Sequence, residues 1–104
     1  MRDSIIIDMR FADYDIISGK SGVERHHCLF GNANREKADI DGLWVPLTPE
    51  HHREGKISAH KCIEMQRLLQ IIAQLAYELN EVSNGLTVEE ARKKFFDRYG
   101  KFYI

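Results

Sequence analysis

The five histidines of this 104-residue chain all lie between residues 26 and 60. They form two adjacent pairs, His26-His27 and His51-His52, followed by the single His60. Imidazole is the commonest protein ligand for transition metals and the side chain best suited to proton transfer near neutral pH. Any one of these residues, taken alone, is more often a surface or core histidine than a ligand. Their joint arrangement predicts a metal site with a general base beside it.

Composition and charge set the class of protein. Hydrophobic residues make up 43% of the chain and charged residues 30%, as in ordinary globular domains. No apolar run approaches the roughly 20 residues that span a bilayer, and the N-terminal segment lacks the length and cleavage site of a secretory signal. We therefore expect one domain over residues 1–104, in the cytoplasm and without a membrane segment. The net charge of -1 argues against strong nonspecific DNA binding and leaves any attraction to phosphate as a local effect.

The two cysteines limit the kinds of metal site that the chain could build. Cys28 and Cys62 are isolated in sequence, so the chain has neither a CxxC zinc motif nor a framework of several disulfides. Any metal must therefore depend on histidine.

Short strands are expected to position the first histidine pair. The isoleucine run predicts a strand over residues 4–11, and residues 14–18 fit either a second short strand or a turn. Residues 23–30 have β-branched and aromatic character, which places His26 and His27 near the end of a strand. Because adjacent strand residues point to opposite faces, the two histidines should have different roles.

A loop, a short strand and a helix start are expected around the second pair. Residues 31–41 are polar and predict a surface loop, and residues 43–47 predict a short strand that Pro46 restricts to an edge. Thr48-Pro49-Glu50 is typical of a helix start, because Thr can accept a hydrogen bond from a free N–H and Pro at the first position loses no donor. His51 and His52 would then lie in a first helical turn.

The remaining histidine precedes a predicted helical region. Gly55 should interrupt the first turn, and Ser58 can cap a second start that carries His60. Apolar residues then recur over residues 63–79 at the spacing of one buried helical face, and Ser83-Asn84-Gly85 should end this helix.

A last helix and an aromatic tail are expected at the C-terminus. Thr87 and Glu90 form a capping box for a helix through about Asp97. The segment 99–104 should fold back on the core.

The order of these motifs resembles the ββα-metal core of the HNH (His-Me finger) endonucleases. It is most similar to small HNH-like proteins of phages and prophages, in which a His-His-x-x-x-Gly stretch is followed by Asn-Arg, a Leu-x-Pro-x-His-His-like turn and a final His. The matching segments are His26-His27-Cys28-Leu29-Phe30-Gly31, Asn34-Arg35, Leu47-Thr48-Pro49-Glu50-His51-His52 and His60. The resemblance covers residues 25–61 well, and residues 95–102 resemble the aromatic tail of that group. It implies an α+β fold with short N-terminal strands, a ββα-metal motif over about 23–62 and a helical part over about 63–104.

The resemblance also implies a role for each histidine. His26, His52 and His60 would be the metal ligands, and His27 would be the general base. His51 remains an alternative to His52, because the sequence cannot fix which imidazole of one helical turn faces His26.

Other site residues follow from the same resemblance. The family places a residue that orients the base on the loop or second strand; we assign Asp41 to this catalytic role, with Asn34 and Asn32 as alternatives. Arg35, Asn34 and Arg53 are the candidate substrate-binding residues, and Arg25 is a further candidate for a bidentate contact with phosphate.

The function implied is that of a metal-dependent DNA endonuclease or nickase from a phage or prophage, acting on double-stranded DNA in a bacterial host cell. A divalent ion (zinc, nickel, manganese or magnesium) would hold the scissile phosphate, and His27 would deprotonate the attacking water.

Two other functions remain open. One is a catalytically silent HNH-like protein that binds a phage or host protein, for example as an inhibitor of host defence; the other is a purely structural zinc site with a closed four-coordinate shell. A homodimer through the helix at residues 63–79 is a further hypothesis.

Overall fold

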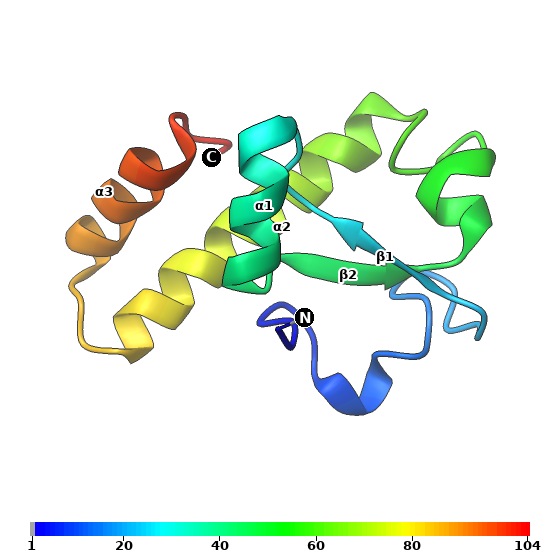
Figure 1. The fold of residues 1–104 in the computed structure, drawn as a ribbon, viewed down its shortest axis with the longest axis horizontal. Coiled ribbons are helices and arrows are strands. Elements are labelled where there is room, and N and C mark those ends of the chain that lie inside the picture. Colours follow the sequence, from blue (N-terminus) through cyan, green and yellow to red (C-terminus); the bar gives the residue numbers. More distant parts are fainter. Residues whose placement is uncertain (1) are drawn as a thin grey trace.

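The computed structural model describes residues 2–104, and of Asn32 only the backbone (Figure 1). Over these residues the chain is α+β, with a two-stranded antiparallel sheet and three α-helices, which confirms the expected α+β class. No helix in this part of the chain is both long and apolar enough to cross a membrane. In chain order the elements are a 3-10 turn at Met9–Phe11, β1 at Glu24–His27, α1 at Asn32–Asp41, β2 at Trp44–Leu47, a π-helical turn at Glu50–Glu54, α2 at Ile63–Ser83 and α3 at Val88–Tyr99.

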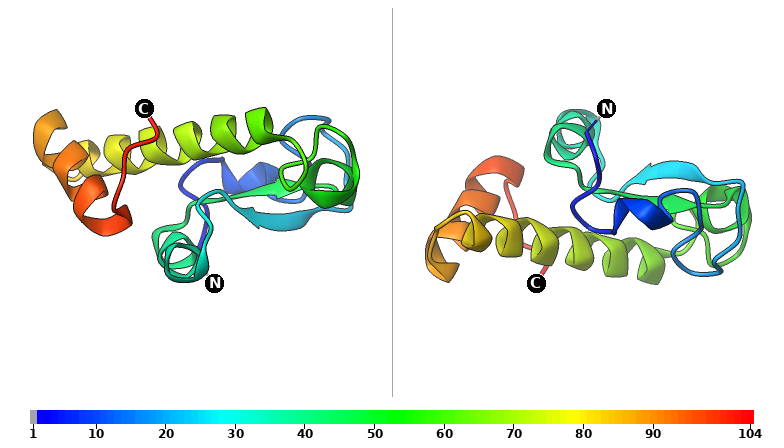
Figure 2. Two further views of the ribbon diagram at one scale, coloured as in Figure 1. Left: turned by 90° about the horizontal axis from the view of Figure 1, so that it is seen from above. Right: turned by 90° about the horizontal axis from the view of Figure 1, so that it is seen from below.

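Strands β1 and β2 lie within the two segments, 23–30 and 43–47, that the sequence predicts as strands. They pair in antiparallel register, with His26 opposite Val45. The alternation along β1 buries His26 to 4% exposure and leaves His27 only partly buried, so the two imidazoles point to opposite faces. Figure 2 shows the sheet lying between α2 on one side and α1 on the other.

The expected N-terminal strand over residues 4–11 does not form. One backbone hydrogen bond joins the Ile5 amide to the Gly42 carbonyl at 2.9 Å, and the 3-10 turn at Met9–Phe11 follows. The isoleucine side chains are partly buried against the core, so they pack without a partner strand. Hydrophobicity alone does not distinguish these two ways of burying an apolar run. Residues 14–18 form a turn, which was one of the two alternatives.

Residues 32–41 form helix α1, within the segment 31–41 that the sequence predicts as a surface loop. The helix has no apolar stripe because most of it faces solvent, and Ala38 is the one residue with a described side chain that is fully buried. Gly42 ends it with φ 74°, and its N–H donates to the carbonyls of Ala38 and Asp39. A Cβ at position 42 would lie 2.5 Å from the carbonyl oxygen of Asp3, so this end of the helix needs glycine.

The helical C-terminal half follows the prediction closely. Helix α2 ends at Ser83, and α3 begins with the expected capping box, in which the Glu90 amide donates to the Thr87 hydroxyl and the Thr87 amide to the Glu90 carboxylate. Helix α3 continues to Tyr99, two residues beyond the predicted end. It returns beside α2 and packs against it, as the left part of Figure 1 shows.

The core of this half is aromatic, and the C-terminal tail packs against it. Phe95 is fully buried, with its ring centroid 5.5 Å from that of Tyr77 and 4.9 Å from that of Tyr99. The buried Gln74 side chain accepts hydrogen bonds from the Tyr103 and Ile104 amides at 2.7 and 3.2 Å. The tail therefore folds back on the core, as expected.

Candidate metal centre

Three imidazoles from three separate elements converge at one end of the sheet. His26 comes from the buried face of β1, His52 from the π-helical turn, and His60 from the turn that precedes α2. Their ring centroids are 5.2 Å apart for His26 and His52, 5.6 Å for His26 and His60, and 4.7 Å for His52 and His60. One ring nitrogen of each lies within 4.8 Å of the others, which is close enough to hold one metal ion.

Backbone hydrogen bonds hold two of these rings side by side. The His60 amide donates to the His52 carbonyl at 3.0 Å, and the Ala59 amide donates to the His51 carbonyl at 2.7 Å. The His52 amide in turn donates to the Thr48 carbonyl at the start of the turn. The relative placement of His52 and His60 is thus set by the main chain.

The second predicted helix start lies later than expected. Ser58 does not begin a helix: its carbonyl accepts from the Lys61 and Cys62 amides in a turn, and α2 starts at Ile63. His60 therefore projects from a turn and not from a helical face.

His26 is the most deeply buried of the three imidazoles. Its Nε2 atom is buried and has no hydrogen-bond partner. Burial, together with the neighbouring His52 and His60, lowers the pKa of His26 to about 3. Burial and the charge on His52 also lower the pKa of His60. Neutral imidazole is the form that binds metal, and an unpaired buried nitrogen is costly unless a cation or donor meets it. The donor set therefore fits a metal ion.

Glu24 supports His52 from the same face of β1 that carries His26. Its Oε1 lies 2.9 Å from His52 Nδ1, and its Oε2 accepts from Arg53 Nη2 at 2.7 Å. The hydrogen bond from His52, with help from the Arg53 charge and against the effect of burial, lowers the pKa of Glu24. With Nδ1 donating to the carboxylate, Nε2 of His52 is the nitrogen available to a metal. The sequence analysis did not name Glu24, although its i, i+2 spacing from His26 on a strand places the two side chains on the same face.

The carboxylate that contacts His27 comes from α1. Asp39 Oδ1 lies 3.0 Å from His27 Nε2, and this hydrogen bond is the main reason that the pKa of Asp39 is lowered. Asp41, which we assigned to this position from the sequence, instead accepts from Arg98 Nε and from the Tyr99 hydroxyl. Residues two apart on a helix point in nearly opposite directions, so only one of the two aspartates can face β1.

Of the two alternatives to Asp41, Asn34 makes no hydrogen bond to His27. Asn34 is partly buried and makes no recorded side-chain hydrogen bond within residues 2–104, and it does not line the cleft around the histidines. The side chain of Asn32 lies outside the described residues.

His51 turns away from the three converging rings. Its Nδ1 lies 2.9 Å from Oδ2 of Asp15, a carboxylate whose side chain is fully buried. The same oxygen accepts from the Thr48 amide and hydroxyl, at 2.7 and 2.8 Å. The Thr48 hydroxyl thus binds Asp15 and does not cap the turn, contrary to the sequence prediction. The choice between His51 and His52 is settled by this geometry in favour of His52 as the residue near His26.

Three arginines surround the histidines in a cleft of about 310 Å³. Arg53 is held by Glu24, and the Arg25 guanidinium lies 4.1 Å from the centre of the Trp44 ring. Arg35 has no side-chain hydrogen bond or ion pair recorded in the described part of the chain. The cleft is lined by Arg25, His26, His27, Phe30, Arg35, His52, Arg53, Ala59, His60 and Gln66.

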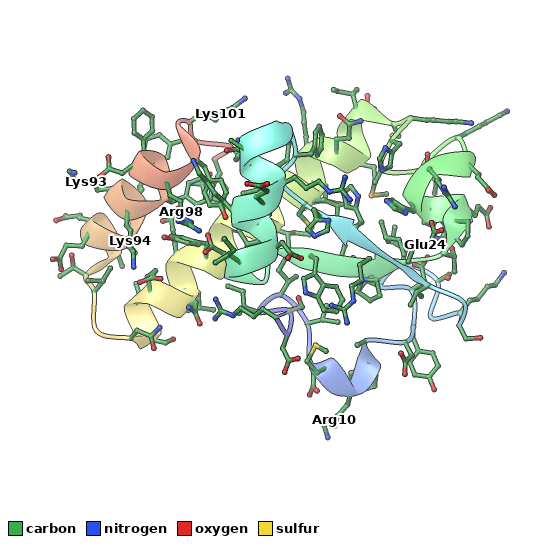
Figure 3. All side chains as sticks on the ribbon, in the orientation of Figure 1. Arg10, Glu24, Lys93, Lys94, Arg98 and Lys101 are labelled. Carbon is green, nitrogen blue, oxygen red and sulfur yellow. The ribbon has the colours of Figure 1, made fainter. Side chains whose placement is uncertain are left out.

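Figure 3 shows where Glu24 lies relative to the charged residues of α3. In Figure 3 Glu24 lies between β1 and the π-helical turn, whereas Arg98 and Lys94 lie at the far end, on α3. The arrangement thus brings three imidazoles close enough to hold a metal ion and lines the same cleft with His27 and three arginines. Comparisons of the chain with models of protein families, with curated proteins and with solved structures found no match.

Proposed function

We propose that the chain is a metal-dependent DNA endonuclease or nickase of the HNH type, with β1, β2 and the histidine-bearing turns as its ββα-metal core. The observation that carries the proposal is the convergence of the His26, His52 and His60 rings in a cleft that also contains His27 and arginines. The buried Nε2 of His26, which has no hydrogen-bond partner among residues 2–104, adds to it. The phage origin and bacterial host belong to the same proposal, on the strength of the resemblance alone.

The donor set favours an open catalytic site over a closed structural one. Among the described residues, no fourth His, Cys, Asp or Glu joins the group of three histidines. A structural zinc site takes four protein ligands, whereas catalytic sites keep positions for water and substrate. Three imidazoles suit zinc or nickel better than magnesium. When bound, the ion would polarise the scissile phosphate and stabilise the departing 3′ oxygen.

His27 is suited to accept a proton from the attacking water. When Nε2–H donates to Asp39, the other nitrogen, Nδ1, carries the lone pair that a general base needs. Asp39 therefore acts in this proposal as a positioning residue that fixes the tautomer and the ring orientation. It takes the place that the sequence assigned to Asp41.

The arginines would bind the phosphates on either side of the scissile bond. A guanidinium can make two parallel hydrogen bonds to a phosphate. Arg35 is the best candidate because it is not engaged by a carboxylate, whereas Arg53 would have to share its charge with Glu24. The overall charge of -1 means that binding depends on this local cluster.

Cleavage of supercoiled plasmid tests the proposal. Metal-stripped protein would be supplemented in turn with magnesium, manganese, nickel and zinc. We expect metal-dependent nicking that His27→Ala abolishes with metal binding largely retained, whereas His52→Ala and His60→Ala lose both. Asp39→Asn should reduce the rate, and Asp41→Asn, two residues away and outside the cleft, is its matched control.

Two outcomes would contradict parts of the proposal. Equal loss of metal in the His26, His27, His52 and His60 variants would refute the division between base and ligands. Stoichiometric metal binding without cleavage under any metal would favour the catalytically silent binding protein.

A further inference from the structure

Phe30 is an aromatic residue that the fold leaves in the cleft. Cys28 and Leu29, just before it, are fully buried, whereas Phe30 is 42% exposed. Gly31 follows with φ 98° and begins α1, so the chain changes direction with the phenyl ring outside the core. Full burial of such a ring would stabilise the fold further, and part of that stabilisation is missing here.

The surroundings of this ring differ from those of other exposed phenylalanines. Phe96 lies 4.9 Å from the ring of Phe102, and Phe11 has the Arg10 guanidinium 5.9 Å from its centre. Phe30 has no such aromatic or cationic partner among residues 2–104. It is also the one Phe, Tyr or Trp side chain that lines the histidine cleft.

The neighbours of Phe30 in the cleft are groups that bind phosphate. Arg35, in the first turn of α1, lines the same cleft, and so does His27. A flat apolar face and a guanidinium that has no side-chain partner among the described residues line one cleft, and they match the two parts of a nucleotide, the base and its phosphate. Stacking of a base on an aromatic side chain contributes about 1–3 kcal/mol.

We infer that Phe30 forms a base-stacking subsite, and that the preferred substrate is a DNA strand with an unpaired base beside the scissile phosphate. The inference rests on the proposed nuclease function. In a duplex, both faces of each base are covered by its neighbours, so the Phe30 ring can stack only on a base that has left the helix or was never paired. The site therefore takes single-stranded, flapped or mismatched DNA in preference to intact duplex.

Equilibrium binding tests this inference without cleavage. A fluorescently labelled single strand and a duplex of the same sequence would be titrated with His27→Ala protein at one fixed salt concentration. We expect the single strand to bind more tightly. Adding Phe30→Ala should weaken single-strand binding by about 5- to 150-fold and duplex binding by less than about 2-fold, while Phe30→Tyr keeps most of the affinity.

The matched control is Phe11→Ala, which removes a phenylalanine that is 59% exposed and does not line the cleft. It should change neither affinity. Equal losses on the single strand and the duplex after Phe30→Ala, no loss on either, or no DNA binding at all would overturn the inference.

Cleavage assays then separate the inference from the function on which it rests. Wild-type protein that cleaves duplex DNA, with a rate that Phe30→Ala leaves unchanged, would refute the stacking subsite and leave the nuclease intact. Protein that cleaves nothing but loses single-strand binding on Phe30→Ala would support the subsite and refute the nuclease.

Discussion

One apolar core runs through both ends of the molecule, but the contacts that fix their side chains differ. In the histidine end, residues 15–62, carboxylates from distant segments fix the imidazoles in place. In the helical end, residues 63–104, two helices pack through buried aromatic rings and are stopped by local caps. The pairs of the histidine end are Asp15 with His51, Glu24 with His52 and Asp39 with His27.

The difference reflects how precisely the side chains of each end must be oriented. Apolar packing tolerates small shifts, but an imidazole must present one particular nitrogen to a metal ion or a proton. A carboxylate bonded to one ring nitrogen fixes both the orientation and the tautomer. Changes in the helical end should therefore alter stability more than site chemistry, and changes in the histidine end should do the reverse.

The largest effect is expected from Phe95→Ala in the helical end. Phe95 is fully buried between the rings of Tyr77 and Tyr99, so its truncation should lower the free energy of unfolding by about 3–5 kcal/mol. Chemical denaturation measures this loss, and the variant that remains folded should still bind one metal ion. Phe96→Ala, with a ring that is 43% exposed, is the control and should cost less than half as much.

Asp15→Asn should have the next largest effect on stability, with a characteristic dependence on pH. Burial tends to raise the pKa of Asp15, but hydrogen bonds from Thr48, Ser18 and His51 outweigh it and hold the pKa well below the usual value. A depressed pKa stabilises the fold above the unfolded-state pKa of about 4, and this contribution is lost as pH falls further. The substitution should cost about 2–3 kcal/mol near pH 7, because hydrogen bonds to a charge are lost.

The pH series distinguishes this explanation from a general loss of packing. The difference between wild type and Asp15→Asn should shrink as the pH falls below about 4. A difference that stays constant from pH 7 to pH 3 would contradict the role of the Asp15 charge. The exposed Asp13→Asn is the matched control and should track wild type throughout.

Glu24→Gln tests whether the histidine end controls chemistry more than stability. Loss of the carboxylate beside His52 and Arg53 should weaken metal affinity by about 10- to 100-fold, the range seen for partners of metal-binding histidines. Competition with a chromophoric chelator measures the affinity. Glu50→Gln, exposed on the same π-helical turn, should leave it unchanged. A loss of stability without a change in metal affinity would remove the distinction between the two ends.

The smallest effect is expected from Thr87→Ala, which removes one half of the capping box. The loss should be about 1 kcal/mol of unfolding free energy, with metal affinity unchanged. Thr87→Ser, which keeps a hydroxyl for the Glu90 amide, should recover most of it. An altered metal affinity in Thr87→Ala would mean that the two ends are coupled through α2.

The same contrast explains what the sequence could predict. Local patterns of caps and apolar spacing predict the capping box, the end of α2 and the return of the tail. The convergence of His26, His52 and His60 was predicted through the resemblance to a known motif. Helix α1 was missed because it is solvated on most of its surface and has no apolar period.

The carboxylate partners were largely out of reach of sequence reasoning. Asp15 lies 36 residues from His51, and nothing local marks that contact. Asp39 could be told from Asp41 only by knowing that the segment is a helix, since their directions in a loop are unconstrained. Glu24 alone had a usable signal, its strand spacing from His26.

Helix α1 links the two ends through side chains on its opposite sides. Asp39 reaches His27, while Asp41 reaches Arg98 and Tyr99 on α3, and Lys37 Nζ donates to the Arg98 carbonyl at 2.9 Å. The side chains of α1 therefore contact β1 on one side and α3 on the other. Because the two sets of contacts lie on opposite sides of the helix, we expect a loss of the α3 contacts to leave the Asp39–His27 hydrogen bond in place.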